Sequence, residues 1–331
     1  MIVAEKAART LIAIPVLLLL LLCVSCAETT TPSLTAKIGA GAPAGIYDDL
    51  VRNIARVVNE YEATTGIRLE RVLTKGSVAN INAVAAGDLQ FGIAQADDQF
   101  NAVNGLGAWA DKGAQEDLRA IAGIYYELVT IVAGGDSEIL SVADLKGKRV
   151  DIGPPGSGTR ANAIDVLEAA GLDWQKDIQL SEMNVDDRLT AFMNGQLDAF
   201  FFTVGHPSVE VKFATFSARK ARLIPLDGID SLLVENPFYT SQAIPLGRYP
   251  RAMNKASTAT VGVRATLITS ASVPDEVVYA VTKTAFENAE KFREYFPEFA
   301  ELRSGDPLEG LTAPLHPGAL KYFQEAGISN K

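Results

Sequence analysis

The chain has 331 residues, of which 48% are hydrophobic and 21% are charged, and its formal net charge at pH 7 is −10. This length accommodates two domains of typical size. The acidic balance argues against binding to nucleic acid or adhesion to anionic lipid.

The first 26 residues are typical of a secretory signal peptide. Lys6 and Arg9 precede a continuous apolar stretch from Leu11 to Leu22. This stretch is too short to span a bilayer comfortably, and basic residues ahead of such a stretch indicate export. We therefore expect residues 1–26 to act as a signal peptide and the protein to be exported to the periplasm.

Val24, Ser25 and Cys26 resemble the end of a lipobox, in which Cys26 would become the lipidated first residue. Because Cys23 stands where that motif usually has leucine, cleavage after Ala27 without lipidation is the alternative. Both cysteines of the chain lie in this leader. The remainder therefore has no disulfide and no cysteine metal site.

After a polar tether over residues 27–34, a strand–helix rhythm begins. Strands are predicted at 37–41, 68–72 and 89–95, with amphipathic helices between them. This βαβαβ order predicts an open, mostly parallel sheet, whose ligands bind beyond the carboxyl ends of the strands. The turns that follow the three strands are expected to converge there.

A second α/β cycle follows an extended segment at residues 127–134. Three more strands are predicted, at 148–154, 178–184 and 197–203, and a return crossing at 259–270. Two cycles joined by two crossings predict two lobes that can close on a ligand. Lobe I would comprise residues 35–127 plus 256–331, and lobe II residues 128–255.

The segment KRVDIGPPGSGTR, residues 148–160, predicts a small anion site. A buried strand ends at a Pro/Gly turn, and Ser157 or Thr159 can cap the helix that follows. The free N–H groups and the positive end of the helix dipole, starting at Gly158, favour a carboxylate or a phosphate, and Arg160 could add a two-pronged charge. An ordinary capped turn is the alternative. A nucleotide is disfavoured because the P-loop lysine is missing.

Polar residues also follow the strands of the first cycle. Ser77 and Asn80 lie at a predicted helix start, where Ser77 could simply be the N-cap or could present a donor to a ligand. Gln95 ends a buried strand and could face the ligand, whereas Asp97 and Asp98 are predicted to be turn residues.

Aromatic residues and one acid mark the walls of the predicted cleft. Tyr47, Tyr125 and Tyr126 offer an apolar body and a hydroxyl, although core positions are the alternative. Glu127 could receive an ammonium group or pair with a lysine at the hinge. The apolar run 200–203 must place at least one phenylalanine in the core or in the cleft.

The histidine content does not indicate catalysis or metal binding. His206 and His316 are far apart in the sequence, and the chain has neither an HExxH motif nor a G-x-S-x-G elbow. We therefore expect no metal, no cofactor and no enzymatic activity. If the protein were an enzyme, His206 and Glu127 would be the nearest candidates for an acid/base pair.

Four ordered segments together resemble the TAXI family of extracytoplasmic solute receptors that serve TRAP transporters. They are GSVANINAVAAGDLQFGIAQADD, DLKGKRVDIGPPGSGTRANAIDVLEAAG, LDAFFFTVGHP and APLHPGALKYFQEAG. The resemblance covers nearly all of the chain after the leader. It implies a type II periplasmic binding-protein fold of the α/β class, with two lobes that are each a mostly parallel sheet flanked by helices.

The resemblance also implies a function and a set of ligand contacts. The receptor would capture a small carboxylate-bearing solute, such as a dicarboxylate, a keto acid or an acidic amino acid, and deliver it to a TRAP membrane permease. The positions that match the family's contacts, with further candidates along the cleft, are Tyr47, Ser77, Asn80, Gln95, Tyr126, Gly158, Thr159, Arg160, Phe202 and Val204.

The first glycine turn departs from the family pattern. Ala40 and Ala42 stand where hydroxyl donors are usual, and Asp48 and Asp49 add acid. Glutamate-like ligands are therefore less expected than the family suggests. A lipid-anchored ligand sensor and an enzyme on the same two-lobed fold are the competing interpretations.

Overall fold

The structure, a computed structural model, describes residues 33–41, 43, 45–295 and 306–328. The predicted signal peptide, its cleavage site and most of the tether lie outside the described residues. None of the described helices is long and apolar enough to cross a lipid bilayer.

The first part of the chain forms the predicted βαβαβ unit. In chain order, its elements are β1 (Leu34–Gly39), α1 (Ile46–Asn59), α2 (Glu62–Thr65), β2 (Ile67–Val72), α3 (Ser77–Ala85), β3 (Phe91–Gln95), α4 (Ala96–Asn104) and a 3-10 turn, η2 (Gly107–Trp109). Strand β1 pairs in parallel with both β2 and β3. The turns after these three strands therefore share one edge of the sheet, as predicted.

The second α/β cycle follows the long strand β4 (Leu118–Gly134). Its elements are η3 (Val142–Leu145), β5 (Arg149–Asp151), α5 (Gly158–Ala169), β6 (Gln179–Ser181), α6 (Val185–Met193), β7 (Ala199–Val204), α7 (Val209–Phe216), β8 (Ala221–Ile224), α8 (Asp230–Glu235), β9 (Thr240–Ile244) and η4 (Leu246–Arg248). Strand β5 pairs in parallel with β6 and β7. This second parallel group is the one that the sequence predicted.

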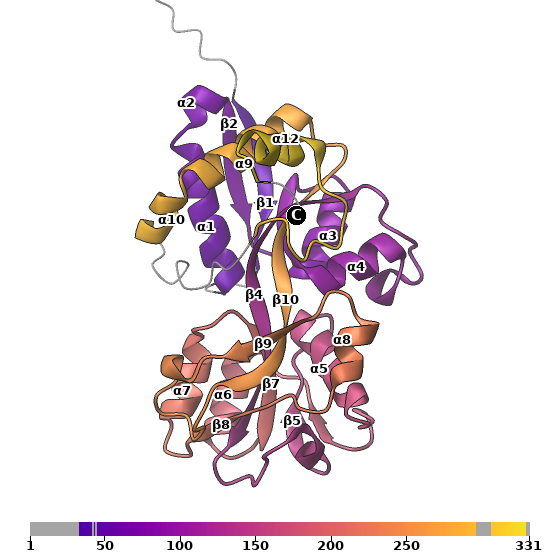
Figure 1. Cartoon of the computed structure of the whole chain (residues 1–331), viewed down its shortest axis with the longest axis vertical. Helices are drawn as coiled ribbons and strands as arrows, with labels where there is room; N and C mark the ends of the chain where they lie inside the picture. Colours follow the sequence, from indigo (N-terminus) through magenta and orange to yellow (C-terminus); the bar gives the residue numbers. More distant parts are fainter. Residues whose placement is uncertain (1–32, 42, 44, 296–305, 329–331) are drawn as a thin grey trace, which may run out of the picture. The chain divides into compact units, whose positions relative to one another are not determined.

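Strand β10 (Thr258–Ser270) returns beside β4 in the antiparallel direction (Figure 1). The two crossing strands join both parallel groups into one ten-stranded sheet with the order β2-β1-β3-β10-β4-β7-β5-β6, from which β8 and β9 branch. The predicted fold class, a mixed α/β sheet flanked by helices and linked by two crossing strands, is confirmed. The boundaries of the two lobes remain a prediction.

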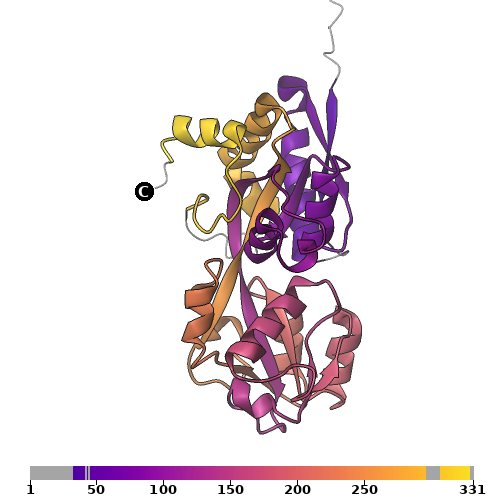
Figure 2. The ribbon, with the colours of Figure 1, turned by 90° about the vertical axis from the view of Figure 1, so that its right-hand side faces the viewer.

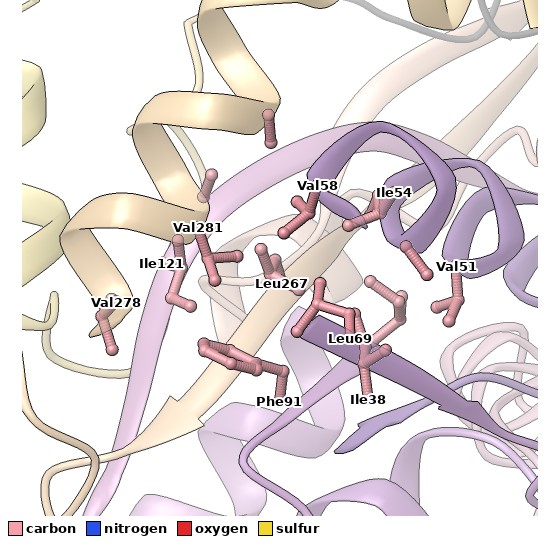
Figure 3. Close-up of a cluster of buried hydrophobic side chains, with 14 of the residues drawn as sticks. Ile38, Val51, Ile54, Val58, Leu69, Phe91, Ile121, Leu267, Val278 and Val281 are labelled. Atoms are coloured by element: carbon pink, nitrogen blue, oxygen red, sulfur yellow. The ribbon is translucent and has the colours of Figure 1, made fainter. Parts of the chain in front are cut away.

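An apolar core lies between β1–β3 and their covering helices (Figure 3). It contains Ile38 of β1, Leu69 of β2 and Phe91 of β3, and α9 (Asp275–Glu287) adds Val278 and Val281. Val51, Ile54 and Val58 are spaced three and four residues apart, so they form one apolar stripe of α1 that faces this core. Such burial fixes how α1 covers the sheet, and with it where the preceding turn lies.

The end of the described chain packs on the same group. Helix α10 (Ala289–Tyr295) follows α9, and α12 (Pro317–Glu325) lies beside α9 (Figures 1 and 2). His316 is the N-cap of α12, where its Nδ1 accepts a hydrogen bond of 3.1 Å from the N–H of Gly318. This histidine therefore has a structural role.

A separate core supports the second cycle. Val150 of β5, Ile152 just after β5, Val166 of α5 and Phe201 of β7 are completely buried together. Because α5 packs on this core, the position of its N-terminus is set by the strands beneath it.

Two local predictions were wrong. The N-cap of α3 is Gly76, whose φ is +102°, and Ser77 is the first helical residue. Asp97 and Asp98 are not turn residues; they form the buried first turn of α4, which continues directly from β3. Gly76 has a positive φ, which glycine adopts readily, so the chain turns into the helix at Gly76 and Ser77 falls inside the helix.

Candidate functional site

The carboxylate of Glu127, on β4, is the centre of a buried polar cluster. Its Oε2 accepts hydrogen bonds from Gln95 Nε2 at 2.7 Å and from the Tyr47 hydroxyl at 3.2 Å, and its Oε1 accepts one from the Tyr125 hydroxyl at 2.9 Å. The side chain of Glu127 is 6% exposed. The structure thus gives Glu127 three neutral donors and neither of the two partners considered from the sequence, an ammonium group or a hinge lysine.

Burial determines the ionisation of this cluster. It raises the pKa of Glu127 to about 7, although the hydrogen bonds from Tyr125, Gln95 and Tyr47 work in the opposite direction. Burial likewise raises the pKa of Tyr47 and of Tyr125, and the charge of Glu127 raises both further. Glu127 therefore exchanges its proton near neutral pH.

Two more carboxylates enter the site from the first turn of α4. Asp97 and Asp98 are 3% and 6% exposed. Burial raises the pKa of Asp97 to about 6, and it raises the pKa of Asp98 as well, with a further contribution from the neighbouring charge of Asp97. Among the described residues, no lysine or arginine forms an ion pair with Asp97, Asp98 or Glu127. These three residues are called the acidic cluster below.

Helix α3 fixes the strand end from which α4 begins. The hydroxyl of Ser77 accepts a hydrogen bond of 3.1 Å from the N–H of Gln95, and it also lowers the pKa of Asp98 through a hydrogen bond. Tyr47 reaches the same place from the start of α1. The sequence-predicted residues Tyr47, Ser77 and Gln95 are therefore brought together around the acidic cluster.

The N-terminus of α5 meets this cluster at Gly158. A Cβ atom built on Gly158 would lie 1.6 Å from Gln95 Oε1, so this carboxamide occupies the space in front of the helix start. The hydroxyl of Ser157 caps the helix by accepting from the N–H of Arg160 at 3.2 Å, as predicted. The N–H groups of Gly158 and Thr159 lie in the first turn, where a helix offers no intrahelical acceptor.

A hydrogen-bond chain connects α4 to α5. Asn162 Nδ2 donates to Asp97 Oδ2 at 2.6 Å and to the Tyr239 hydroxyl at 2.8 Å, and the Tyr239 hydroxyl donates to Asp165 Oδ2 at 2.8 Å. Asn162 is completely buried. Burial also raises the pKa of Asp165. The carboxylate of Asp165 is therefore connected to that of Asp97 by hydrogen bonds through the neutral side chains of Tyr239 and Asn162.

Several buried acceptor atoms in and beside this site have no hydrogen-bond partner in the described part of the chain. They include Gln95 Oε1, Asp98 Oδ2 and Asn162 Oδ1. Buried polar atoms are nearly always paired in folded proteins, so a group of orphaned acceptors points to a missing donor.

The side chain of Asn80 is hydrogen-bonded to the backbone of two neighbouring segments. Its Nδ2 donates to the carbonyl oxygens of Ala40 and Ile93, both at 2.7 Å, and the side chain is completely buried. It thus ties the end of β1 to that of β3, next to the site. Its predicted contact with a ligand stays a prediction.

Arg160 and Thr159 also have partners within the protein. The guanidinium of Arg160 pairs with the carboxylate of Glu182 and lies 5.0 Å from the centre of the Trp174 ring. The hydroxyl of Thr159 accepts from the N–H of Thr203 at 3.2 Å. To bind a ligand, the guanidinium of Arg160 would have to break its ion pair with Glu182, or contact the ligand while it keeps that pair.

The remaining three predicted residues lie on the opposite face of the sheet from Glu127. Tyr126 precedes Glu127 on β4, and alternate residues of a strand point to opposite faces. The guanidinium of Arg264 lies 4.7 Å from the centre of the Tyr126 ring. The cross-strand pairs Leu128–Val204 and Thr130–Phe202 place Val204 and Phe202 on the side of Tyr126 as well. The structure thus separates them from the acidic cluster.

The hypothetical acid/base pair of His206 and Glu127 is not assembled. His206 Nε2 bonds to the hydroxyl of Thr130 at 2.9 Å, and its Nδ1 contacts the Tyr249 hydroxyl. Burial lowers the pKa of His206 to about 3, so it is neutral. Within the described ranges, no group of three or more His, Cys, Asp or Glu side chains has a geometry that could hold a metal ion.

An apolar pocket elsewhere in the structure shares no residue with the acidic cluster. It lies between α1, α9 and α10 and is lined by residues such as Leu50, Ile54, Phe286 and Phe292. Its lining offers little polar chemistry, so the polar cluster at Glu127 is the better candidate for a specific binding site.

Sequence reasoning missed Asn162, Asp165 and Tyr239 and left Glu127 undecided. Asn162 and Asp165 follow the GSGTR turn by less than two helical turns. Their side of α5 could have been deduced from the apolar positions of that helix. Tyr239 lies in the segment before β9, and no local pattern points to it.

Comparisons with known proteins agree with this architecture. A protein from Bordetella bronchiseptica RB50 superposes with a TM-score of 0.52 at 15% identity, covering 88% of this chain and 98% of that chain. A candidate L-cystine ABC transporter protein from Listeria monocytogenes gives 0.50 at 13% identity, with 82% and 98% covered. The periplasmic aliphatic sulphonate binding protein SsuA from Escherichia coli gives 0.49 at 17% identity, with 88% and 78% covered.

The chain therefore shares its mixed α/β fold, in which two α/β groups are joined by crossing strands, with these solved structures. The family model of the NMT1-like family matches residues 38–327, and the chain belongs to this family. The family model does not test the resemblance to the TAXI receptors, which stays a prediction.

Proposed function

We propose that this protein is the solute-binding receptor of a TRAP-type transporter. It would be exported to the periplasm, capture a small carboxylate-bearing solute between its two lobes, and deliver the solute to the membrane permease. The leader over residues 1–26, the TAXI-like segments and the fold support this proposal. A lipid anchor at Cys26 belongs to the same proposal.

One observation carries the binding function. Buried polar groups from separate parts of the chain converge at a single place, where Gln95 of β3, Glu127 of a crossing strand and Gly158 of α5 meet. Ligand sites in open α/β sheets lie at such carboxyl ends of strands. This place gathers groups from both α/β cycles. A ligand that contacts groups of both cycles would hold them together.

The start of α5 supports a carboxylate as one end of the ligand. Gly158 and Thr159 present first-turn N–H groups, and the helix of Gly158–Ala169 adds its dipole. In the structure the position in front of Gly158 is taken by Gln95 Oε1, which is itself an acceptor oxygen. A ligand carboxylate would replace that oxygen at the helix start.

Native mass spectrometry of the purified protein tests the proposal, followed by a thermal-shift screen of small carboxylates and amino acids. A co-purified or strongly stabilising acid is expected, because a ligand that binds only the folded state raises stability with its concentration. If only compounds without a carboxylate stabilise the protein, the carboxylate assignment is wrong. Catalytic turnover of the bound compound would instead favour an enzyme.

A further inference from the structure

We infer that helix α4 is a latch, whose contacts with α5 and with the segment before β9 hold the two α/β groups together even when no solute is bound. The first group is β1–β3 with their helices, and the second is β5–β7 with theirs. The latch consists of Asp97 and Phe100 on α4 and of Asn162, Phe238 and Tyr239 in the second group. These are positioning residues. The inference rests on the proposed function, because closure of the two groups encloses the proposed solute site.

Helix α4 is fixed to the first group at both of its ends. It continues directly from β3, and at its start the Thr312 hydroxyl donates a hydrogen bond of 2.5 Å to the carbonyl oxygen of Ala96. Just beyond its end, Trp109 Nε1 donates to Asn82 Oδ1 of α3 at 3.0 Å, and the Trp109 ring is completely buried. We therefore expect α4 to move together with β3 and α3.

The other side of α4 packs on the second group. The ring centres of Phe100 and Phe238 are 5.5 Å apart, and Phe238 is 7% exposed. Ala96, at the start of α4, is completely buried in the apolar core of the second group, and Phe100 packs against that core. Helix α4 lies next to α5, at the level where β4 and β10 cross between the groups (Figure 1). Separation of the two groups would expose these apolar contacts to water.

A buried hydrogen bond lies in the same contact. Asn162 Nδ2 donates to Asp97 Oδ2 at 2.6 Å and to the Tyr239 hydroxyl at 2.8 Å. An amide nitrogen carries two hydrogens, so both are engaged. Asn162 is completely buried and Asp97 is 3% exposed. Opening breaks a hydrogen bond to a carboxylate at the moment when it exposes the Phe100 ring, so the two contacts act together.

Every group in the latch belongs to the chain itself, so the latch can form without a solute. The side chains that donate to Glu127 are those of Tyr47, Gln95 and Tyr125, and none of them is part of the latch. When the binding-competent state of a protein is only partly populated, every ligand binds more weakly by the same factor. The latch should therefore change the affinities of all solutes equally and leave their ranking unchanged.

Distances between two spin labels on the solute-free protein test the inference. Both cysteines of the chain lie in the predicted leader, so Asp88→Cys and Lys176→Cys give the mature chain two unique labelling sites. Both positions are exposed, the first beside β3 and the second beyond α5. Pulsed electron–electron double resonance measures the distribution of label distances. We expect one short distance for the wild-type latch, from the state in which the two groups are closed.

Variants of the latch should add a longer distance, from the open state. Phe100→Ala and Asn162→Ala each remove one contact, and in either variant the ratio of closed to open molecules should fall roughly tenfold, the scale of one lost hydrogen bond to a charged group. Phe100→Leu keeps an apolar contact with Phe238 and should restore most of the short distance. Phe213→Ala removes an exposed ring from α7 and should change nothing.

Two results would overturn the inference. One is a wild-type protein that already shows the long distance without a solute, and the other is a pair of latch variants with the wild-type distribution. Circular dichroism at the temperature of the distance measurement shows whether each variant is folded. Phe100 is only partly buried, so Phe100→Ala decides the test if Asn162→Ala does not fold.

Binding gives a second readout, which a contact with the solute would change in a different way. Phe100→Ala should weaken the binding of all compounds that stabilise the protein in the thermal-shift screen by one common factor. Unequal losses would show that Phe100 selects among solutes, and the inference would then be wrong. If no carboxylate binds, the proposed function fails, whereas the label distances still decide whether α4 is a latch.

Discussion

Asn162 Nδ2 donates a hydrogen bond of 2.6 Å to Asp97 Oδ2, and this bond joins α5 to α4. The two residues are 65 positions apart and both are buried. The same amide also donates to Tyr239, which in turn donates to Asp165. One asparagine therefore holds together groups that reach the candidate site from three separate segments.

Removal of this amide should destabilise the protein. Asn162→Ala leaves Asp97 without its side-chain donor, and we expect the free energy of unfolding to fall by about 1–3 kcal/mol. Urea denaturation measures the loss. Asn104→Ala is the control, because Asn104 is exposed and donates only to Phe100 of its own helix. Equal free energies of unfolding for the two variants would show that the hydrogen bond to Asp97 makes no net contribution to stability.

Gly158 should be intolerant of a side chain because of Gln95. In Gly158→Ala the new methyl group would displace Gln95 Oε1 and turn the carboxamide away from Glu127. We expect ligand affinity to fall roughly tenfold, equivalent to about 1.4 kcal/mol. Calorimetry on Gly158→Ala, Gln95→Ala and the double variant measures the coupling. If the loss of binding free energy in the double variant equals the sum of the losses in the two single variants, the two positions act independently.

Glu127 should make the ligand-free protein less stable as the pH rises. Its pKa in the folded state is about 7 against an ordinary value of 4.5, so the folded protein keeps this proton to higher pH than the unfolded chain. The stabilisation by this proton is complete below about pH 4.5 and is lost through pH 7, at a cost of about 3 kcal/mol.

Urea unfolding at pH 5 and pH 8 tests this dependence. Glu127→Gln should show a smaller loss between the two values, and the remaining loss should come from Asp97 and Asp98, whose pKa values are also raised. A wild-type protein with the same pH dependence as Glu127→Gln would show that Glu127 is not held protonated near neutral pH.

His206 should make the folded protein less stable as the pH falls, which is the opposite of the effect of Glu127. Its pKa in the folded state is lowered to about 3 from 6.5, so the stability it contributes is present above pH 6.5 and is lost as the pH falls toward 3. At pH 5 the loss should be about 2 kcal/mol. The chain has two histidines, so the NMR signal of the His206 ring is easily assigned. An observed pKa near 6.5 would contradict the buried, neutral state.

Arg160→Ala tests whether the arginine reaches the ligand. If its guanidinium shares the ligand carboxylate with the N–H groups of Gly158 and Thr159, the affinity should fall about tenfold or more. Glu182→Gln is the companion variant, because it releases Arg160 from its ion pair and should then raise the affinity. Unchanged affinity in both variants would show that Arg160 acts only on Glu182 and Trp174.

The local part of the site follows from local chemistry. A turn with Pro154 and Gly156 follows the strand, and Ser157 caps the next helix. Both features depend on a few adjacent residues, so the capped start of α5 is predictable from the sequence. Gln95 was placed correctly because a buried strand ends there. The family resemblance added Tyr47, which the structure does bring to Glu127.

Which side of an element a single residue occupies could not be predicted from the sequence. Tyr125 and Tyr126 look equivalent in the sequence, yet the alternation of β4 directs one to Glu127 and the other to Arg264. Asp97 and Asp98 read as turn residues because nothing local reveals that β3 continues directly into α4. In both cases the neighbouring strands and helices decide the outcome.

Periodicity and capping act over a few residues, so the α/β class, the two cycles, the crossing strands and the capped helix start follow from the amino-acid sequence. The environment of Glu127, in contrast, depends on the assembled fold. Its donors come from residues 32 and 80 positions away and from Tyr125 beside it, and burial among them raises its pKa. Desolvation and long-range contacts depend on the assembled fold, so no local pattern could have revealed them.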